Sequence, residues 1–273
     1  MKRSAYLTTS RVQALADQLG FRDWEIVQTL SKLRTAQGRQ IQRLHFADEP
    51  EGTQARRCRR HLRRLADLGV VSRLDRVVGG VRAGSSGHVY SLSTGGAKLA
   101  ARLGRSSVTR PQKPTTPGAA FLGHQLAISE LYVRLVEAER ARHLELLTYD
   151  AEPDCWRSFV GPMGGRSWVK PDASAELGIG TAYIDSYFIE IDRATQSSAV
   201  LAQKCVSYRQ YAASGREQER TGVFPEVVFL VPDERRKALV VDVLAKQPAD
   251  SWKLFRVGLF DEAVELFTRG DKQ

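Results

Sequence analysis

The chain has 273 residues, of which 42% are hydrophobic and 26% charged, so it can form one large or two ordinary globular domains. No run of about 18 apolar residues occurs, and no apolar segment follows the first residues, which predicts a cytoplasmic protein that does not enter a membrane. Cys58, Cys155 and Cys205 are far apart and match no metal-binding spacing, as expected for a reducing compartment.

Positive charge is concentrated in the first part of the chain, although the net charge of the whole is only +10. Residues 1–117 hold 22 Lys and Arg against 8 Asp and Glu, whereas the remainder holds 19 against 23. A basic half is typical of a protein that binds nucleic-acid phosphates, and a mildly acidic half suits a catalytic or metal-binding domain. The charge division therefore predicts two domains with different tasks.

A helix rich in arginine is predicted at residues 53–68, after three shorter helices. Helical spacing of apolar residues predicts those three at 8–19, 23–33 and 37–44, with Asp23 as an N-cap. The apolar stripe of the longer helix is Ala55, Cys58, Leu62 and Leu65. Its other face carries Arg56, Arg57, Arg59, Arg60, Arg63 and Arg64. Such a face makes best sense if a polyanion neutralises it, and the alternative is a solvated basic face.

A β-hairpin is predicted after this helix, with a glycine-rich tip at 79–87, a returning strand at 88–92 and a closing helix at 94–103. Helix, helix, arginine-rich helix and hairpin, in this order, predict a winged helix-turn-helix domain over residues 1–104 that binds double-stranded DNA. Arg82 near the tip is expected to contact the DNA backbone or minor groove.

The second half begins after a predicted linker at 105–118, which contains three prolines and no hydrophobic pattern. Over residues 119–273 the pattern predicts an α/β (α+β) domain with a mixed sheet flanked by helices. Its predicted helices are 119–143, 197–213 and 234–245. Its predicted strands are 145–152, 168–177, 182–191, 226–231 and 252–258.

Two neighbouring strands carry acids where strands seldom do. Glu190 and Asp192 share one face of their strand, and the adjacent strand brings Asp172 to the same place. Three carboxylates repel one another unless a cation lies among them, and hard oxygen ligands suit Mg²⁺ or Mn²⁺. The alternative is that these acids lie at strand ends and face water.

The order of elements around VKPDASAEL and FIEIDRATQSSAVLAQKCVSYRQY resembles the core of the PD-(D/E)xK nuclease superfamily, whose fold is restriction-endonuclease-like. With RRLADLGVVSR and GHVYSLSTGG included, residues 20 to 235 resemble the actinobacterial replication-relaxation proteins, which are similar to MOB-C type conjugative relaxases. The resemblance implies that Asp172 and Glu190 hold the metal and that Asp192 is a further ligand or orients water. The superfamily usually has Lys where Asp192 stands, and Lys204 on the next helix is placed to supply that charge.

The expected function is therefore sequence-specific DNA binding combined with metal-dependent nicking or relaxation of DNA in plasmid replication or conjugative transfer. The alternative is a non-catalytic replication or transcription regulator with a nuclease-derived domain. Glu130, Glu152 and His124 are secondary candidates for the site, although a structural or solvent-exposed role is more common for such residues. The sequence leaves open whether the protein is a monomer or a homodimer.

Overall fold

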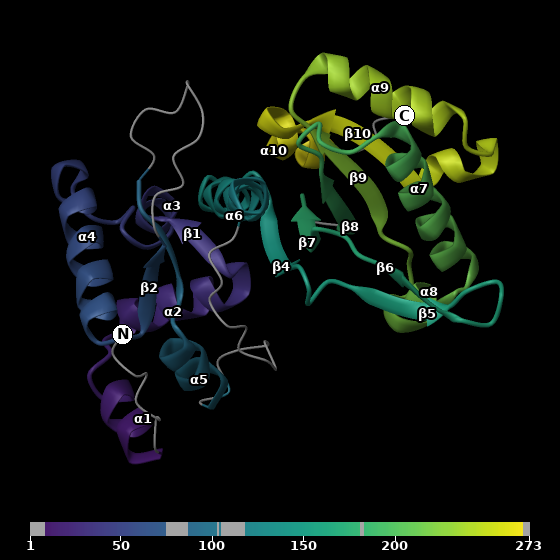
Figure 1. Ribbon diagram of the computed structural model, residues 1–273. Coiled ribbons are helices and arrows are strands. Elements are labelled where there is room, and N and C mark those ends of the chain that lie inside the picture. The colour runs from purple at the N-terminus through teal and green to yellow at the C-terminus, as the bar shows by residue number, and fades with distance from the viewer. Residues whose placement is uncertain (1–8, 75–86, 103, 105–117, 181–182, 270–273) are drawn as a thin grey trace. The chain divides into compact units, whose positions relative to one another are not determined.

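The computed structural model describes residues 9–74, 87–102, 104, 118–180 and 183–269 (Figure 1). Two compact units divide the chain, residues 1–133 and residues 134–273. The division falls inside helix α6 (Ala119–Arg140), whereas that whole helix was predicted to belong to the second domain. The linker predicted at 105–118 lies almost entirely outside the described residues. Within the described ranges, no helix is long and apolar enough to cross a membrane.

The N-terminal unit combines helices with a small antiparallel sheet in the order β1-β3-β2. Its elements are α1 (Thr9–Ala16), α2 (Phe21–Leu33), β1 (Thr35–Gln37), α3 (Gly38–His45), α4 (Glu51–Asp67), β2 (Val71–Leu74), β3 (Val89–Leu92) and α5 (Thr94–Arg102), followed by the first part of α6. All the predicted helices are present, but β1 was not predicted, because three residues show no recognisable alternation. The hairpin tip and Arg82 lie outside the described residues.

The core of this unit lies between α2, α4 and the sheet. Ile26, Leu30, Leu62 and Leu65 are fully buried there, as their helical spacing predicted. Asp23 differs from its predicted role as N-cap, because α2 already begins at Phe21. The N-cap is Gly20, whose backbone N–H donates to Asp23 Oδ2 at 3.0 Å, so Asp23 accepts from the cap residue as in a capping box.

The C-terminal unit is built on a mixed sheet of five strands in the order β10-β9-β8-β7-β4. Its strands are β4 (Glu145–Ala151), β5 (Arg157–Val160), β6 (Arg166–Val169), β7 (Ala173–Ile179), β8 (Tyr183–Ile191), β9 (Glu226–Val231) and β10 (Phe255–Leu259). Its helices after α6 are α7 (Ser198–Ala213), α8 (Arg216–Thr221), α9 (Glu234–Ala245), η1 (Ala249–Leu254), η2 (Phe260–Glu262) and α10 (Ala263–Thr268). β8, β9 and β10 run parallel, and β7 is antiparallel to β8 and β4. The predicted α/β fold with a mixed sheet flanked by helices is confirmed.

One predicted strand is wrong in its extent. The stretch 168–177 is divided between β6, which pairs with β5 in a separate two-stranded hairpin, and β7 of the main sheet. Pro171 lies in the break and has no N–H to donate to a ladder. Asp172 is consequently the last residue before β7, and the β5–β6 hairpin leads directly into it (Figure 1).

The two faces of the sheet are covered by different helices. On one face, Phe188 of β8 and Phe229 of β9 pack with α7 and α9 in a single apolar cluster. On the other, Tyr187 contacts Phe267 of α10, with 4.8 Å between ring centroids. Successive strand residues point to opposite faces, so Glu190, two residues after Phe188, lies on the face covered by α7.

Candidate functional site

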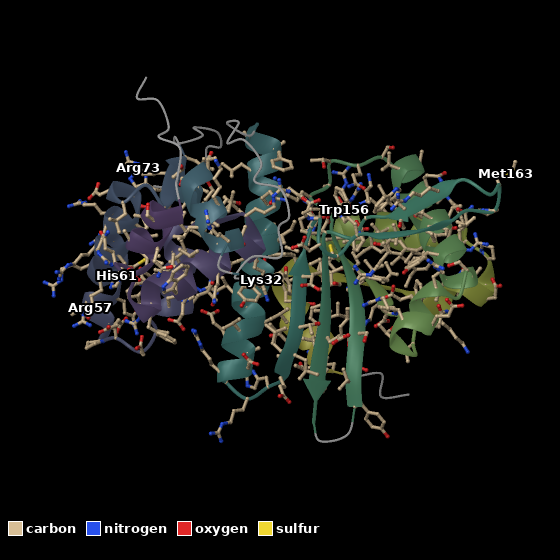
Figure 2. All side chains as sticks on the ribbon, turned by 90° about the horizontal axis from the view of Figure 1, so that it is seen from below. Lys32, Arg57, His61, Arg73, Trp156 and Met163 are labelled. Atoms are coloured by element: carbon tan, nitrogen blue, oxygen red, sulfur yellow. The ribbon has the colours of Figure 1, made fainter. Side chains whose placement is uncertain are left out.

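The basic face of α4 forms as the sequence predicted, and six of its arginines are exposed: Arg56, Arg57, Arg59, Arg60, Arg63 and Arg64. Two of the six bind acids of the same unit. Arg57 pairs with Glu49 at 2.5 Å, and Arg64 pairs with Asp23. Figure 2 shows Arg57 at the outer edge of the unit. The other four, Arg56, Arg59, Arg60 and Arg63, form no ion pair with any described residue.

Asp23 fixes α4 against α2. Its carboxylate is buried and accepts hydrogen bonds from His61 at 2.9 Å and from Arg64. Burial by itself would raise the pKa of Asp23, but hydrogen bonds from His61, the Gly20 N–H and Arg64 outweigh it and lower that pKa. The ionised Asp23 therefore holds α4 in a defined orientation within the N-terminal unit.

In the C-terminal unit, Asp172, the residue just before β7, lies next to Glu190 of β8. Asp172 precedes β7, whose first residue, Ala173, is paired with Ile189 of β8. The backbone N–H of Asp172 donates to Ile189 O at 2.9 Å, and the N–H of Ile191 donates to Asp172 Oδ2 at 2.7 Å. Both carboxylates are buried. The structure therefore brings these two acids together in the sheet, as the sequence predicted.

Glu190 is also bonded to two side chains of α7. Lys204 Nζ forms an ion pair with Glu190 Oε2, and the Tyr208 hydroxyl donates to Glu190 Oε1 at 2.7 Å. Lys204 and Tyr208 are four residues apart, so one helix face presents both. Ser197 starts α7 in this register, since its side chain accepts from the Val200 N–H.

The charges of this group shift one another's pKa values. Burial raises the pKa of Glu190 to about 7; Lys204 opposes this rise and Asp172 adds to it. Burial lowers the pKa of Lys204, but attraction to Glu190 and Asp172 outweighs it, so that pKa is raised overall. Lys204 is consequently protonated at neutral pH, while Glu190 can gain or lose a proton there.

Asp192, predicted as a third ligand, is bonded to Arg236 of α9. Arg236 Nε and Nη2 approach Asp192 Oδ2 at 2.8 and 2.7 Å, and the Ala194 N–H donates to Oδ1 at 2.7 Å. Arg236 also donates to Gln196 O at 2.6 Å. Both members of the ion pair are buried. Arg236 was not singled out from the sequence, because nothing local marks it among the many arginines of this chain.

The predicted metal ion fits only some of these residues. In the part of the chain that the structure describes, no group of three or more His, Cys, Asp or Glu side chains could hold a metal. Mg²⁺ in phosphate-processing sites is, however, usually held by one or two carboxylates together with substrate phosphates. Each carboxylate oxygen has two lone pairs, so an oxygen that accepts one hydrogen bond keeps a lone pair with which it could bind a cation. Asp172 and Glu190 are the two carboxylates that would take this arrangement. Glu190 is already paired with Lys204, as Asp192 is with Arg236, so a cation at Glu190 would share that carboxylate with Lys204.

The three secondary candidates lie at different places. Glu130 belongs to the N-terminal unit, where it pairs with Arg43 at 2.6 Å and accepts from Gln40 at 2.9 Å. His124 lies on α6 in the same unit. Glu152 follows β4, and its N–H donates to Asp172 O at 3.0 Å, so its backbone helps to position Asp172.

Comparison with known proteins identifies the family. The replication-relaxation family model matches residues 27–227, which is most of the chain and includes α4, Asp172, Glu190 and Lys204. The chain belongs to the replication-relaxation family. Membership indicates a role in plasmid replication or transfer. No curated protein and no solved structure gives a significant match.

The raised pKa of Glu190 predicts that the free energy of unfolding depends on pH. Its value in the folded protein, about 7, lies above the ordinary value of 4.5, so the folded state binds the proton more tightly and gains stability at low pH. That gain is complete below pH 4.5 and is lost as the pH rises through 7. We expect the free energy of unfolding, relative to a Glu190→Gln variant, to fall across this range by about 3 kcal/mol at most. Urea unfolding at several pH values measures it, and a constant difference would contradict the prediction.

Proposed function

We propose that this replication-relaxation protein binds duplex DNA through its N-terminal unit and nicks DNA at the Asp172–Glu190–Lys204 site of its C-terminal unit. The observation that carries the proposal is the contact of Lys204 with Glu190 while Asp172 lies beside Glu190 on the next strand. Two acids and a lysine on adjacent elements match the composition of the nuclease superfamily that the sequence resembles. The similarity to MOB-C type relaxases stays a prediction.

Duplex binding is supported by the order of elements around α4. Helices α2, α3 and α4 are followed by the antiparallel strands β2 and β3, as in a winged helix, where the helix before the hairpin enters the major groove. The four arginines of α4 that form no ion pair with a described residue lie on the face opposite to Cys58, Leu62 and Leu65. Phosphates would neutralise their charge and release counterions, which is the main source of affinity in such complexes.

Removal of this charge should weaken DNA binding. We expect an Arg59→Ala, Arg60→Ala, Arg63→Ala variant to bind duplex DNA at least about tenfold more weakly, with a salt dependence flatter by about one unit of slope for each arginine that no longer neutralises a phosphate. Fluorescence anisotropy with a labelled duplex, at a series of salt concentrations, measures both quantities.

The matched control removes three exposed arginines from the C-terminal unit: Arg216, Arg235 and Arg269. It changes the net charge equally and should bind duplex DNA nearly as well as the wild type. If both triple variants lose the same affinity, α4 contributes only general charge and is not the DNA-binding helix.

Catalysis would use the C-terminal residues in separate roles. Asp172 and Glu190 would hold Mg²⁺ or Mn²⁺, which when bound would activate water and offset negative charge on a phosphodiester. Lys204, protonated at neutral pH, would stabilise the charge that grows on the phosphate during cleavage. Tyr208 donates to Glu190 and so positions that carboxylate. Asp192 and Arg236 would support the end of β8 and take no direct part.

A non-catalytic regulator is the second candidate. It is favoured by the residue two positions after Glu190, where the superfamily usually has a lysine. Here that residue is Asp192, and it is paired with Arg236. Incubation of the purified protein with supercoiled plasmid carrying its cognate origin, in Mg²⁺ or Mn²⁺, separates the two candidates. Open circles support the nickase. A plasmid that stays supercoiled in every metal, although the protein binds it, supports the regulator.

A further inference from the structure

The β5–β6 hairpin presents one face to the apolar core and the other to solvent. Phe159 and Val169 point inward and belong to the cluster beneath α7. The register pairs Ser158 with Trp168 and Val160 with Arg166, and these four residues form the opposite face. That outer face is fixed in place, because the inner one is anchored in the core.

Two cation–ring pairs lie on this side of the hairpin. Arg166 lies over the Trp168 ring at 4.7 Å from its centroid, and Lys170 lies over the Trp156 ring at 4.8 Å. Trp168 is 42% exposed, so its ring remains accessible. Figure 2 shows Met163, which is 97% exposed, at the far end of the hairpin. An accessible aromatic ring beside cations is the composition of surfaces that bind single-stranded nucleic acid.

The local charge differs from that of the surrounding unit. From Cys155 to Lys170 the sequence CWRSFVGPMGGRSWVK contains three cations and no acid, whereas residues 118–273 as a whole carry more acids than bases. Arg166 donates to Ser158 Oγ at 3.2 Å, and no ion pair within the described residues occupies Arg166 or Lys170. A polyanion is therefore the occupant whose charge complements this face.

The hairpin leads directly into the candidate site. Lys170 is two residues before Asp172, and the intervening Pro171 is held by Cys155, whose Sγ donates to Pro171 O at 3.0 Å. Cys155 in turn precedes Trp156, so both ends of the hairpin are joined next to Asp172. The hairpin is therefore joined directly to the segment that carries Asp172.

We propose that the outer face of the β5–β6 hairpin, with Arg166 and Trp168 on it and with Trp156 and Lys170 where the two strands begin and end, binds single-stranded DNA by base stacking and phosphate contacts. This inference rests on the proposed function, because it assigns the hairpin to guiding one strand of opened DNA to the nicking site. Stacking on a ring tolerates any base, so binding at this face depends little on sequence.

The test is the affinity of the full-length protein for labelled oligothymidylate, which forms no duplex. We expect Trp168→Ala to weaken binding about tenfold and Trp168→Phe to retain most of it, since a phenyl ring still stacks. Arg166→Ala should flatten the salt dependence by about 0.7, because one phosphate is no longer neutralised. The matched control is Trp252→Ala, which removes another exposed tryptophan of the same unit and should change nothing.

Duplex binding by the same variants keeps this inference distinct from the proposed function. The hairpin variants should bind duplex DNA as tightly as the wild type, whereas the α4 triple variant should bind it more weakly. Wild-type protein that fails to bind oligothymidylate, or Trp168→Ala that binds it unchanged, overturns the inference and leaves duplex binding intact. Equal loss of duplex affinity in Trp168→Ala also overturns it and makes the hairpin a duplex contact.

Discussion

Asp172→Ala and Glu190→Ala variants should leave supercoiled plasmid uncut under conditions in which the wild type produces open circles. Each variant loses one of the two carboxylates that would hold the metal, and a Mg²⁺ site with so few protein ligands cannot spare one. We expect a loss of about a hundredfold to a thousandfold in nicking rate, in line with the removal of a group that stabilises transition-state charge. Agarose gels of timed reactions measure it. Duplex affinity should stay at the wild-type value, because α4, the helix that we propose to bind DNA, belongs to the other unit.

Glu176→Ala is the matched control. Glu176 lies on β7, four residues beyond Asp172 and on the same face of the sheet, but without contact to Lys204. Its removal should leave the nicking rate nearly unchanged, and Lys204→Ala should slow cleavage without removing the metal. If Asp172→Ala nicks as fast as wild type, or if Mn²⁺ binds equally well without Asp172, the proposed site is wrong.

Arg236→Met should destabilise the C-terminal unit more than any exposed substitution. It leaves the buried carboxylate of Asp192 without its cation, and breaking a buried ion pair from one side typically costs about 3–5 kcal/mol. Urea unfolding, followed by far-ultraviolet circular dichroism, measures the decrease in stability. An Asp192→Asn, Arg236→Met double variant should recover a large part of it, because no uncompensated charge stays buried.

The control for this substitution is Lys237→Met on the next residue of α9. Lys237 pairs with the exposed Glu234 at 3.2 Å, and a surface pair of this kind contributes less than about 1 kcal/mol. Equal destabilisation by Lys237→Met and Arg236→Met would show that the buried pair with Asp192 adds nothing to stability.

Local patterns predicted the elements well where one residue period extended over many residues. The stripe of Cys58, Leu62 and Leu65 fixed both the position of α4 and its basic face. The apolar residues of 182–191 likewise located β8 to within a residue. The sequence did not predict several shorter elements. The strands β1 and β5 and the helices α8 and α10 are too short for a residue period to be recognised.

The site could be predicted in part, because some of its residues lie close together in the sequence. Glu190 lies on β8 and Asp172 directly precedes β7, so the pairing of two strands adjacent in sequence brought them together, and Lys204 follows on the next helix. Arg236 is 44 residues from Asp192, and its approach depends on how α9 packs over the sheet. The sequence pattern assigned all six arginines of α4 to DNA, although Arg57 and Arg64 bind Glu49 and Asp23. Both acids lie outside α4, so the pattern of that helix could not reveal these pairs.

The position of Glu190 in the sheet decides which group would move if a phosphate binds at the proposed site. β8 is hydrogen-bonded to β7 on one side and to β9 on the other, so Glu190 cannot shift without opening the middle of the sheet. Asp172 is held just as firmly by the Ile191 N–H. Lys204 instead extends from a helix surface on a flexible four-carbon stem. If substrate binds there, the conformational cost would fall on the Lys204 side chain, whose ammonium group would change rotamer, while the two carboxylates would keep the positions they have in the folded protein.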